Sequence, residues 1–181
     1  IDIDIYKATK EDIISDLIYD EEYQQINPKP NVSNRTKIAS AKTTLKGDRW
    51  NREPISLPLQ GSGIWLIHIH TNELESFAYV LRSNIGSIVK EGTNEFVIWT
   101  QDLSTLRSVN GGIVQMLTLK NTHNMIHEYG IDGAGIATAP ITDNVDIAFV
   151  QRGDEVVVAV PFLVVSWGAA LEDLLHGVGR Q

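Results

Sequence analysis

The stretch Gly61 to Arg82, GSGIWLIHIHTNELESFAYVLR, decides the fold of this chain, because it has the pattern of a strand, a tight turn and a second strand. Alternate residues of the first arm share a face, with Ile64, Leu66, His68 and His70 on one side and Trp65, Ile67 and Ile69 on the other. Both faces are largely apolar, so we expect this strand in the middle of a sheet or between two layers. The second arm alternates in the same way, which predicts an antiparallel partner.

Further strands follow the hairpin, separated by turn residues. The pattern predicts strands at Ile64 to His70, Ser76 to Arg82, Glu95 to Thr100, Val145 to Val150 and Glu155 to Val165, and a shorter one at Ser87 to Lys90. Ile113 to Leu119 is compatible with strand or helix, and its β-branched start favours strand. Because strands and helices do not alternate regularly, the fold class expected is a β-rich α+β domain with an antiparallel sandwich or jelly-roll-like core.

Several helices are also predicted. Thr9 followed by Asp12 has the capping-box spacing, and Ile13, Ile14, Leu17 and Ile18 share a helical face, which predicts an N-terminal helix from about Thr9 to Gln25. Its acidic side chains, Asp16 among them, are expected on a solvated outer surface. Short helices are predicted from Asp102 or Ser104 to Val109 and from Asn121 or Thr122 to Tyr129, and a C-terminal helix carries Ala170, Leu171, Leu174 and Leu175.

The chain divides by composition into three segments. Residues 1–26 hold a strand and the acidic helix, residues 27–58 form a basic extended arm or loop rich in proline and polar residues, and residues 59–181 form the β-rich core domain. Ile1 to Ile5 alternates strictly, which indicates an edge strand or an extended arm with its aspartates outward.

Composition excludes several classes of protein. The 181 residues include no cysteine, which rules out disulfides, thiolate metal ligands and a cysteine nucleophile. We find no apolar run long enough for a spanning helix and no signal peptide, so no membrane partner is expected. A net charge of -8 argues against nucleic-acid binding by the whole domain. The compartment stays undecided, although a virion or extracellular location is favoured.

The basic charge is concentrated in the arm. Residues 29–52 contain seven basic side chains and one acidic one, whereas residues 1–28 contain eight acidic and two basic ones. We expect the arm to pack on something other than its own domain, namely the acidic surface of another copy. The predicted subunit contacts are Lys37, Lys42, Lys46, Arg49, Trp50 and Arg52. Nucleic acid is a possible partner only through residues 29–52.

Histidine pairs provide the one candidate for metal chemistry. His68 and His70 lie on one strand face, and His123 and His127 would share a helix face. Two imidazole pairs with a nearby carboxylate can bind a divalent transition metal. The alternative site is therefore His68, His70, Glu75 and His127. If these histidines are only polar residues at a strand end and on a helix surface, the protein needs no metal or other cofactor.

Two pieces of the sequence also resemble motifs of the cupin family. His68-Ile69-His70, four residues and then Glu75 resembles the first cupin metal-binding motif, and GDEVVVAVP from Gly153 to Pro161 resembles the strand that opens the second. The resemblance implies a metal-dependent enzyme or a small-molecule-binding protein. The histidine that the second motif needs after the proline is missing, because Phe162 to Trp167 contain no metal ligand.

No phosphate-binding loop, dinucleotide glycine pattern, nucleophile elbow or HExxH motif is present in the sequence. The function predicted from the sequence is a structural subunit that assembles with copies of itself, of virion, phage-tail or extracellular filament type, without a catalytic site. The alternative is the cupin-like metal protein.

Overall fold

The computed structural model of the protein describes residues 1–20, 25–28, 30–44, 54–118, 125–141 and 145–159. Its elements in chain order are β1 (Asp2–Ala8), α1 (Lys10–Asp16), β2 (Leu17–Asp20), β3 (Gln25–Pro28), β4 (Lys37–Lys42), β5 (Gly63–His70), β6 (Glu75–Arg82), β7 (Ile85–Glu91), β8 (Glu95–Asp102), β9 (Arg107–Ser108), β10 (Ile113–Thr118), β11 (Met125–Gly130), β12 (Ile136–Pro140), β13 (Ile147–Arg152) and β14 (Glu155–Ala159). The described residues contain no helix long and apolar enough to cross a membrane.

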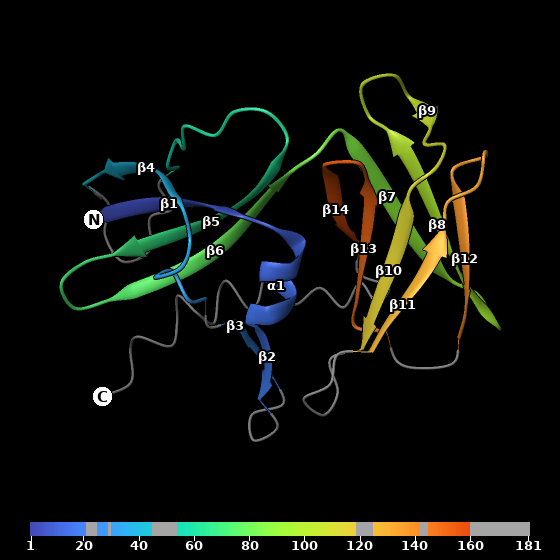
Figure 1. The fold of residues 1–181 in the computed structure, drawn as a ribbon, viewed down its shortest axis with the longest axis horizontal. Helices are drawn as coiled ribbons and strands as arrows, with labels where there is room; N and C mark the ends of the chain where they lie inside the picture. The colour runs from blue at the N-terminus through green and yellow to red at the C-terminus, as the bar shows by residue number, and fades with distance from the viewer. Residues whose placement is uncertain (21–24, 29, 45–53, 119–124, 142–144, 160–181) are drawn as a thin grey trace.

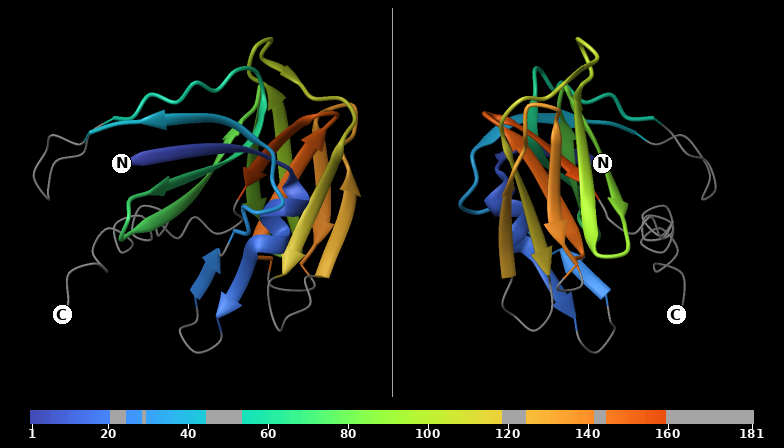
Figure 2. Two further views of the ribbon diagram at one scale, coloured as in Figure 1. Left: turned by 60° about the vertical axis from the view of Figure 1, so that its left-hand side comes forward. Right: turned by 90° about the vertical axis from the view of Figure 1, so that its right-hand side faces the viewer.

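The strands form antiparallel sheets (Figure 1). One has the order β4-β1-β5-β6, a second β11-β10-β13-β14, and a third β12-β8-β7 with β9 paired to β8. β2 and β3 form a two-stranded ladder of their own. In Figure 1 and in the left view of Figure 2, the sheet of β1 extends to one side of the strands β7 to β14. The prediction of a β-rich antiparallel fold is confirmed.

The hairpin at Gly61 to Arg82 is present as predicted. β5 and β6 pair from Gly63↔Arg82 to His70↔Glu75, around the turn at residues 71–74. The two faces of β5 separate as the alternation requires: Ile64 and Leu66 enter one apolar cluster, whereas Trp65 and Ile67 enter another. β5 is therefore covered on both faces.

The second and third sheets pack face to face as a β-sandwich. Their shared core draws Phe96 and Ile98 from β8, Val114 and Met116 from β10, and Val150 from β13, all almost fully buried. Intervening residues of β13 point the other way, so β13 is buried along most of its length. A strand apolar on both faces suits this middle position.

A second apolar cluster joins the sandwich to the sheet of β1. Leu117, Ile147 and Phe149 from the sandwich pack with Tyr6 of β1 and Leu66 of β5. The opposite face of the β1 sheet is covered by a third cluster, in which residues 54–60 place Ile55, Leu57 and Leu59 over the sheet. The β1 sheet is thus also covered on both sides.

The N-terminal strand lies inside its sheet and not at an edge, which corrects our expectation for Ile1 to Ile5. β1 pairs with β4 on one side and with β5 on the other, with Asp4 opposite Ser40 and His68. Ile3 and Ile5 are fully buried. The alternation gave the correct faces, but the distant partners that cover both edges of β1 left no local signal.

The predicted helix from Thr9 to Gln25 is shorter than expected. Thr9 and Asp12 do form the capping box: the Thr9 N–H donates to Asp12 Oδ2 (2.7 Å), and the Asp12 N–H donates to Thr9 Oγ1 (3.2 Å). α1 ends at Asp16, and Leu17–Asp20 pairs with Gln25–Pro28. Ladder hydrogen bonds to β3 replace the helical ones, so pairing overrides the helical spacing of Leu17 and Ile18.

The arm also differs from the prediction. Residues 37–42 form β4 in the same sheet as β1, and the Lys7 N–H donates to the Thr36 carbonyl (3.0 Å). Asp16, expected in solvent, is buried and paired with Arg35. The expected pairing of basic arm and acidic helix therefore occurs within one chain. Residues 37–42 of the arm thus pair with their own chain, whereas a contact of the arm with another copy stays a prediction.

Two other predicted helices are absent from the described part of the chain. Asp102 accepts hydrogen bonds from the Ser104 and Thr105 N–H groups, as a helix cap does, but the chain turns at Leu106 (φ 57°) into β9. Met125–Gly130 is a strand because it pairs with β10 from Ile113↔Gly130 onward. The predicted C-terminal helix and the second half of the strand at Glu155 to Val165 lie outside the described residues.

Candidate functional site

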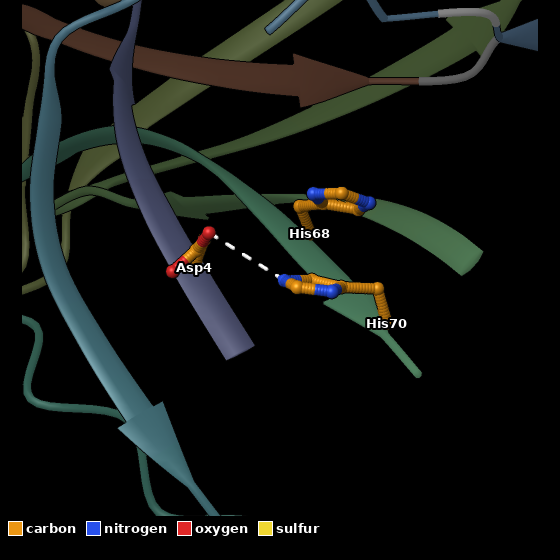
Figure 3. Close-up of side chains that lie close together, drawn as sticks. All are labelled: Asp4, His68 and His70. Carbon is orange, nitrogen blue, oxygen red and sulfur yellow. Dashed lines mark ion pairs between the residues drawn. The ribbon is translucent and has the colours of Figure 1, made fainter. Parts of the chain in front are cut away.

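Three polar side chains gather on the β1 sheet, near the β5 to β6 turn. Asp4 comes from β1, and His68 and His70 come from one face of β5. The strand pairing puts Asp4 directly opposite His68. One potential metal-ligating atom from each residue lies within 4.8 Å of the other two (Figure 3).

The three side chains are held in contact with one another. His70 Nε2 lies 3.5 Å from Asp4 Oδ2, and the imidazoles of His68 and His70 stack with ring centroids 4.5 Å apart. Phe77, on β6 opposite His68, stacks on the other face of the His68 ring at 4.4 Å and 7°. The His68 ring is therefore held between the rings of His70 and Phe77.

Hydrogen bonds fix the Asp4 carboxylate from the side of β4. The Ser40 hydroxyl donates to Asp4 Oδ1 (2.6 Å) and the Lys37 ammonium donates to Asp4 Oδ2 (2.9 Å). The Ser40 hydroxyl first, and the Lys37 ammonium next, lower the pKa of the Asp4 carboxyl to about 2. Asp4 is thus ionised at any pH at which a neutral imidazole is available as a ligand.

Glu75 is the second carboxylate of the site, and its role differs from that of Asp4. Its Oε2 lies 3.0 Å from His68 Nε2, so this pair uses one ring nitrogen of His68 and leaves Nδ1. A carboxylate in that position orients an imidazole for a ligand at its other nitrogen. The side chains of Asp4, His68 and His70 are 15%, 13% and 31% exposed, so the group is open to solvent on one side.

The other residues singled out from the sequence lie elsewhere. His127 is exposed on β11, in a different sheet, and is not part of the group. His123 lies outside the described residues, as do Lys46, Arg49, Trp50 and Arg52. Lys37 and Lys42 are on β4 and pair with Asp4 and Asp2 of the same chain; a second contact of theirs with another copy stays a prediction.

Sequence reasoning missed Asp4. The only signal for it is the alternation of Ile1 to Ile5, which places Asp2 and Asp4 on the polar face of a strand without saying which strand lies next to it. The two cupin-like pieces lie in different sheets, the first on β5 and the second on β14. In the structure the residue beside His68 and His70 is Asp4, which is not part of the cupin-like motif.

No family model matches the sequence, and no curated protein matches it. The fold does resemble solved structures. A fragment of native α2-macroglobulin from Escherichia coli that spans domains MG0-NIE-MG1 superposes with a TM-score of 0.67 at 17% identity, covering 88% of this chain and 54% of that one. A shorter fragment that spans NIE-MG1 gives 0.63 at 16%, covering 88% and 82%.

A mutant of Salmonella α2-macroglobulin gives a TM-score of 0.54 at 15% identity, covering 87% of this chain and 10% of that one. This chain therefore spans about half the length of the larger Escherichia coli fragment and a small part of the Salmonella protein. At these identities the likeness concerns the fold alone. The chain has a β-sheet architecture similar to that of the NIE-MG1 region of α2-macroglobulin.

Proposed function

We propose that this chain is a structural contact module within a longer protein of α2-macroglobulin type, and that it has no catalytic role of its own. The observation that carries the proposal is the fold likeness, which covers 88% of this chain and 82% of the NIE-MG1 fragment. The region that matches this chain makes up only 10% of the Salmonella chain, so there it is one part of a much larger protein. By analogy, this module would support neighbouring domains through its surfaces.

One outer surface supports such a contact role. Ile88 and Trp99 lie directly opposite each other on β7 and β8, and they are 61% and 38% exposed. Leu103 and Leu106, in the turn that follows β8, are 54% and 71% exposed. Apolar side chains clustered on a sheet surface are typical of a face that another protein surface covers.

The native mass of the purified chain tests this proposal. In multi-angle light scattering at physiological salt, we expect a monomer at low protein concentration. At higher concentration the chains should associate weakly through the exposed apolar surface, and the double substitution Ile88→Ser and Trp99→Ser should abolish this association. The matched control is Lys90→Ser with Glu95→Ser, which changes the same hairpin without removing apolar surface. A closed oligomer of fixed size, unaffected by either pair of substitutions, would contradict the contact-module proposal.

Self-assembly with copies of itself is the second candidate, and the position of β4 favours it. β4 is an edge strand, and among the described residues no strand pairs with its outer side. Ile38 on β4 is 50% exposed. An open edge can pair with another chain. The fold likeness gives no support to the virion or filament type of subunit.

A charge on that edge separates the two candidates. Ile38→Asp should dissociate an assembly that depends on pairing at β4, because edge charges oppose strand addition. It should leave an association through Ile88 and Trp99 unchanged.

Nucleic-acid binding through residues 29–52 also stays a prediction, although Arg35 already forms an ion pair with Asp16 within the chain. Salt-sensitive binding to a nucleic acid would support it.

A further inference from the structure

We propose that Asp4, His68 and His70 form a binding site for a borderline divalent transition metal such as Zn²⁺, with at least one coordination position open to solvent. The proposal goes beyond the structural role and does not depend on it. It rests on the geometry of the group shown in Figure 3.

The distances fit a small coordination sphere. Ligand bonds of about 2.0–2.2 Å in a tetrahedral site put neighbouring ligand atoms roughly 3.4 Å apart. His70 Nε2 and Asp4 Oδ2 are already 3.5 Å apart, and the third ligand atom, from His68, lies within 4.8 Å of both. To complete such a sphere, the ligand atom of His68 has to come closer to the other two by roughly 1 Å.

The surrounding residues preorganise the ligands. Glu75 holds His68 Nε2, which leaves Nδ1 for the metal. Ser40 holds the second oxygen of Asp4 at 2.6 Å and keeps Oδ2 on the histidine side. Because ligands fixed in this way lose little freedom on binding, the group is suited to an ion and not only to hydrogen bonding.

The donor set selects the class of ion. Two imidazole nitrogens and one carboxylate oxygen suit Zn²⁺, Ni²⁺, Cu²⁺ or Co²⁺, whereas Mg²⁺ and Ca²⁺ prefer oxygen ligands alone. Three protein ligands leave the fourth position to water or to an external group. The partial exposure of all three side chains gives that position access from solvent.

Lys37 competes with the metal for Asp4. Its ammonium lies 2.9 Å from Oδ2, the oxygen that faces His70, but the Lys37 side chain is 48% exposed and free to turn into solvent. Binding of a dication should displace it, because like charges repel at this distance. Removal of the lysine charge should therefore strengthen metal binding, an effect that a purely structural cluster would not show.

The direct test is titration of the tag-free chain with ZnCl₂ in a calorimeter, using a buffer that does not bind zinc. We expect one equivalent to bind, and His70→Ala and Asp4→Asn each to weaken binding at least about tenfold. The matched control, His127→Ala, removes an exposed histidine of another sheet and should leave the affinity unchanged. MgCl₂ should give no saturable binding at this group.

Lys37→Gln should tighten zinc binding by roughly fivefold. Its matched control is Lys42→Gln on the same strand, which breaks the pair with Asp2 (3.1 Å) and touches no ligand. Circular dichroism and the melting temperature of each variant show whether it is folded. Should a ligand variant fail to fold, the unmodified chain still decides, because Co²⁺ must broaden the NMR signals of His68 and His70 before those of His127.

Three results would overturn the proposal. They are no saturable zinc binding by the unmodified chain, binding that persists unchanged in folded His70→Ala, and equal broadening of all histidine signals by Co²⁺. Each would leave Asp4, His68 and His70 as a cross-strand hydrogen-bonded cluster without an ion.

Discussion

At the scale of single residues, one buried polar cluster joins segments that are far apart in sequence. Arg35 of the arm pairs with Asp16 of α1, and Tyr79 of β6 donates its hydroxyl hydrogen bond to the same carboxylate. Arg35 also donates to the Tyr79 oxygen at 2.9 Å. Because Arg35 and Asp16 are both buried, loss of one partner leaves a polar group without compensation.

Tyr79→Phe should change how stability depends on alkaline pH. Burial first, and the hydrogen bond to Asp16 next, raise the pKa of the Tyr79 phenol well above its ordinary value. In the unfolded chain the phenol loses its proton near pH 10. Above that pH the folded state binds more protons than the unfolded state, so the free energy of unfolding falls as pH rises. Tyr79→Phe removes this part of the fall.

The measurement is urea denaturation at a series of pH values from neutrality upward. At neutral pH, Tyr79→Phe should cost about 1–3 kcal/mol for the lost hydrogen bond to a charged partner. Tyr129→Phe is the control, since Tyr129 is partly buried on β11 in another sheet. An unchanged alkaline slope in Tyr79→Phe would show that the phenol does not carry the effect.

At the scale of elements, α1 depends on its first turn. It has seven residues, too few for stability on its own, and it is held by the capping box and by Ile13 in the shared cluster. Thr9→Ala should cost about 1 kcal/mol of unfolding free energy, because the Asp12 N–H loses its acceptor.

Ser15→Ala provides the control for Thr9→Ala in the same denaturation experiment. Ser15 is exposed and donates only to the Asp12 carbonyl within the helix, so its loss should cost less than about 0.5 kcal/mol. Equal costs for the two substitutions would mean that the capping box contributes nothing.

The elements that could be predicted from the sequence are those whose signal is local. The β5 to β6 hairpin and the described part of the β13 to β14 hairpin have short turns between apolar arms, and both agree with the prediction. β11 was predicted as a helix because capping residues precede it, while its pairing with β10 left no local trace. For the same reason, the sequence could not predict the central position of β1 or the presence of Asp4 in the site, because both depend on β5, far along the chain.

At the scale of the whole molecule, the apolar cluster that contains Phe149 joins the sandwich to the β1 sheet and should make their unfolding cooperative. Phe149, 1% exposed, packs against residues of both the sandwich and the β1 sheet. We therefore expect the two parts to unfold in one transition. Phe149→Ala should lower the free energy of unfolding by about 3–5 kcal/mol, because it leaves a cavity where the two parts meet.

Two tryptophans make this test possible. Trp65 lies on β5 in the β1 sheet, and Trp99 lies on β8 in the sandwich. Two variants are needed, one that keeps only Trp65 and one that keeps only Trp99, with the other tryptophans replaced by phenylalanine. The fluorescence of the two variants should report the same denaturation midpoint. Separate midpoints would show that the two parts unfold independently. Val157→Ala is the control for Phe149→Ala, because Val157 of β14 is only partly buried and packs against the sandwich core.

The central position of β1 has a consequence for synthesis of the chain. Within this sequence β1 leaves the ribosome before β4 and long before β5, yet Ile5 pairs with Ala39 and Ile67. Contacts of such large sequence separation close slowly, because the entropy of the intervening loop must be overcome first. Until β5 has been translated, the apolar side chains of Ile3 and Ile5 have no complete covering. β1 is therefore made before both of its partner strands and is covered only after β5 has followed, and during that interval its apolar side chains can be bound by a chaperone.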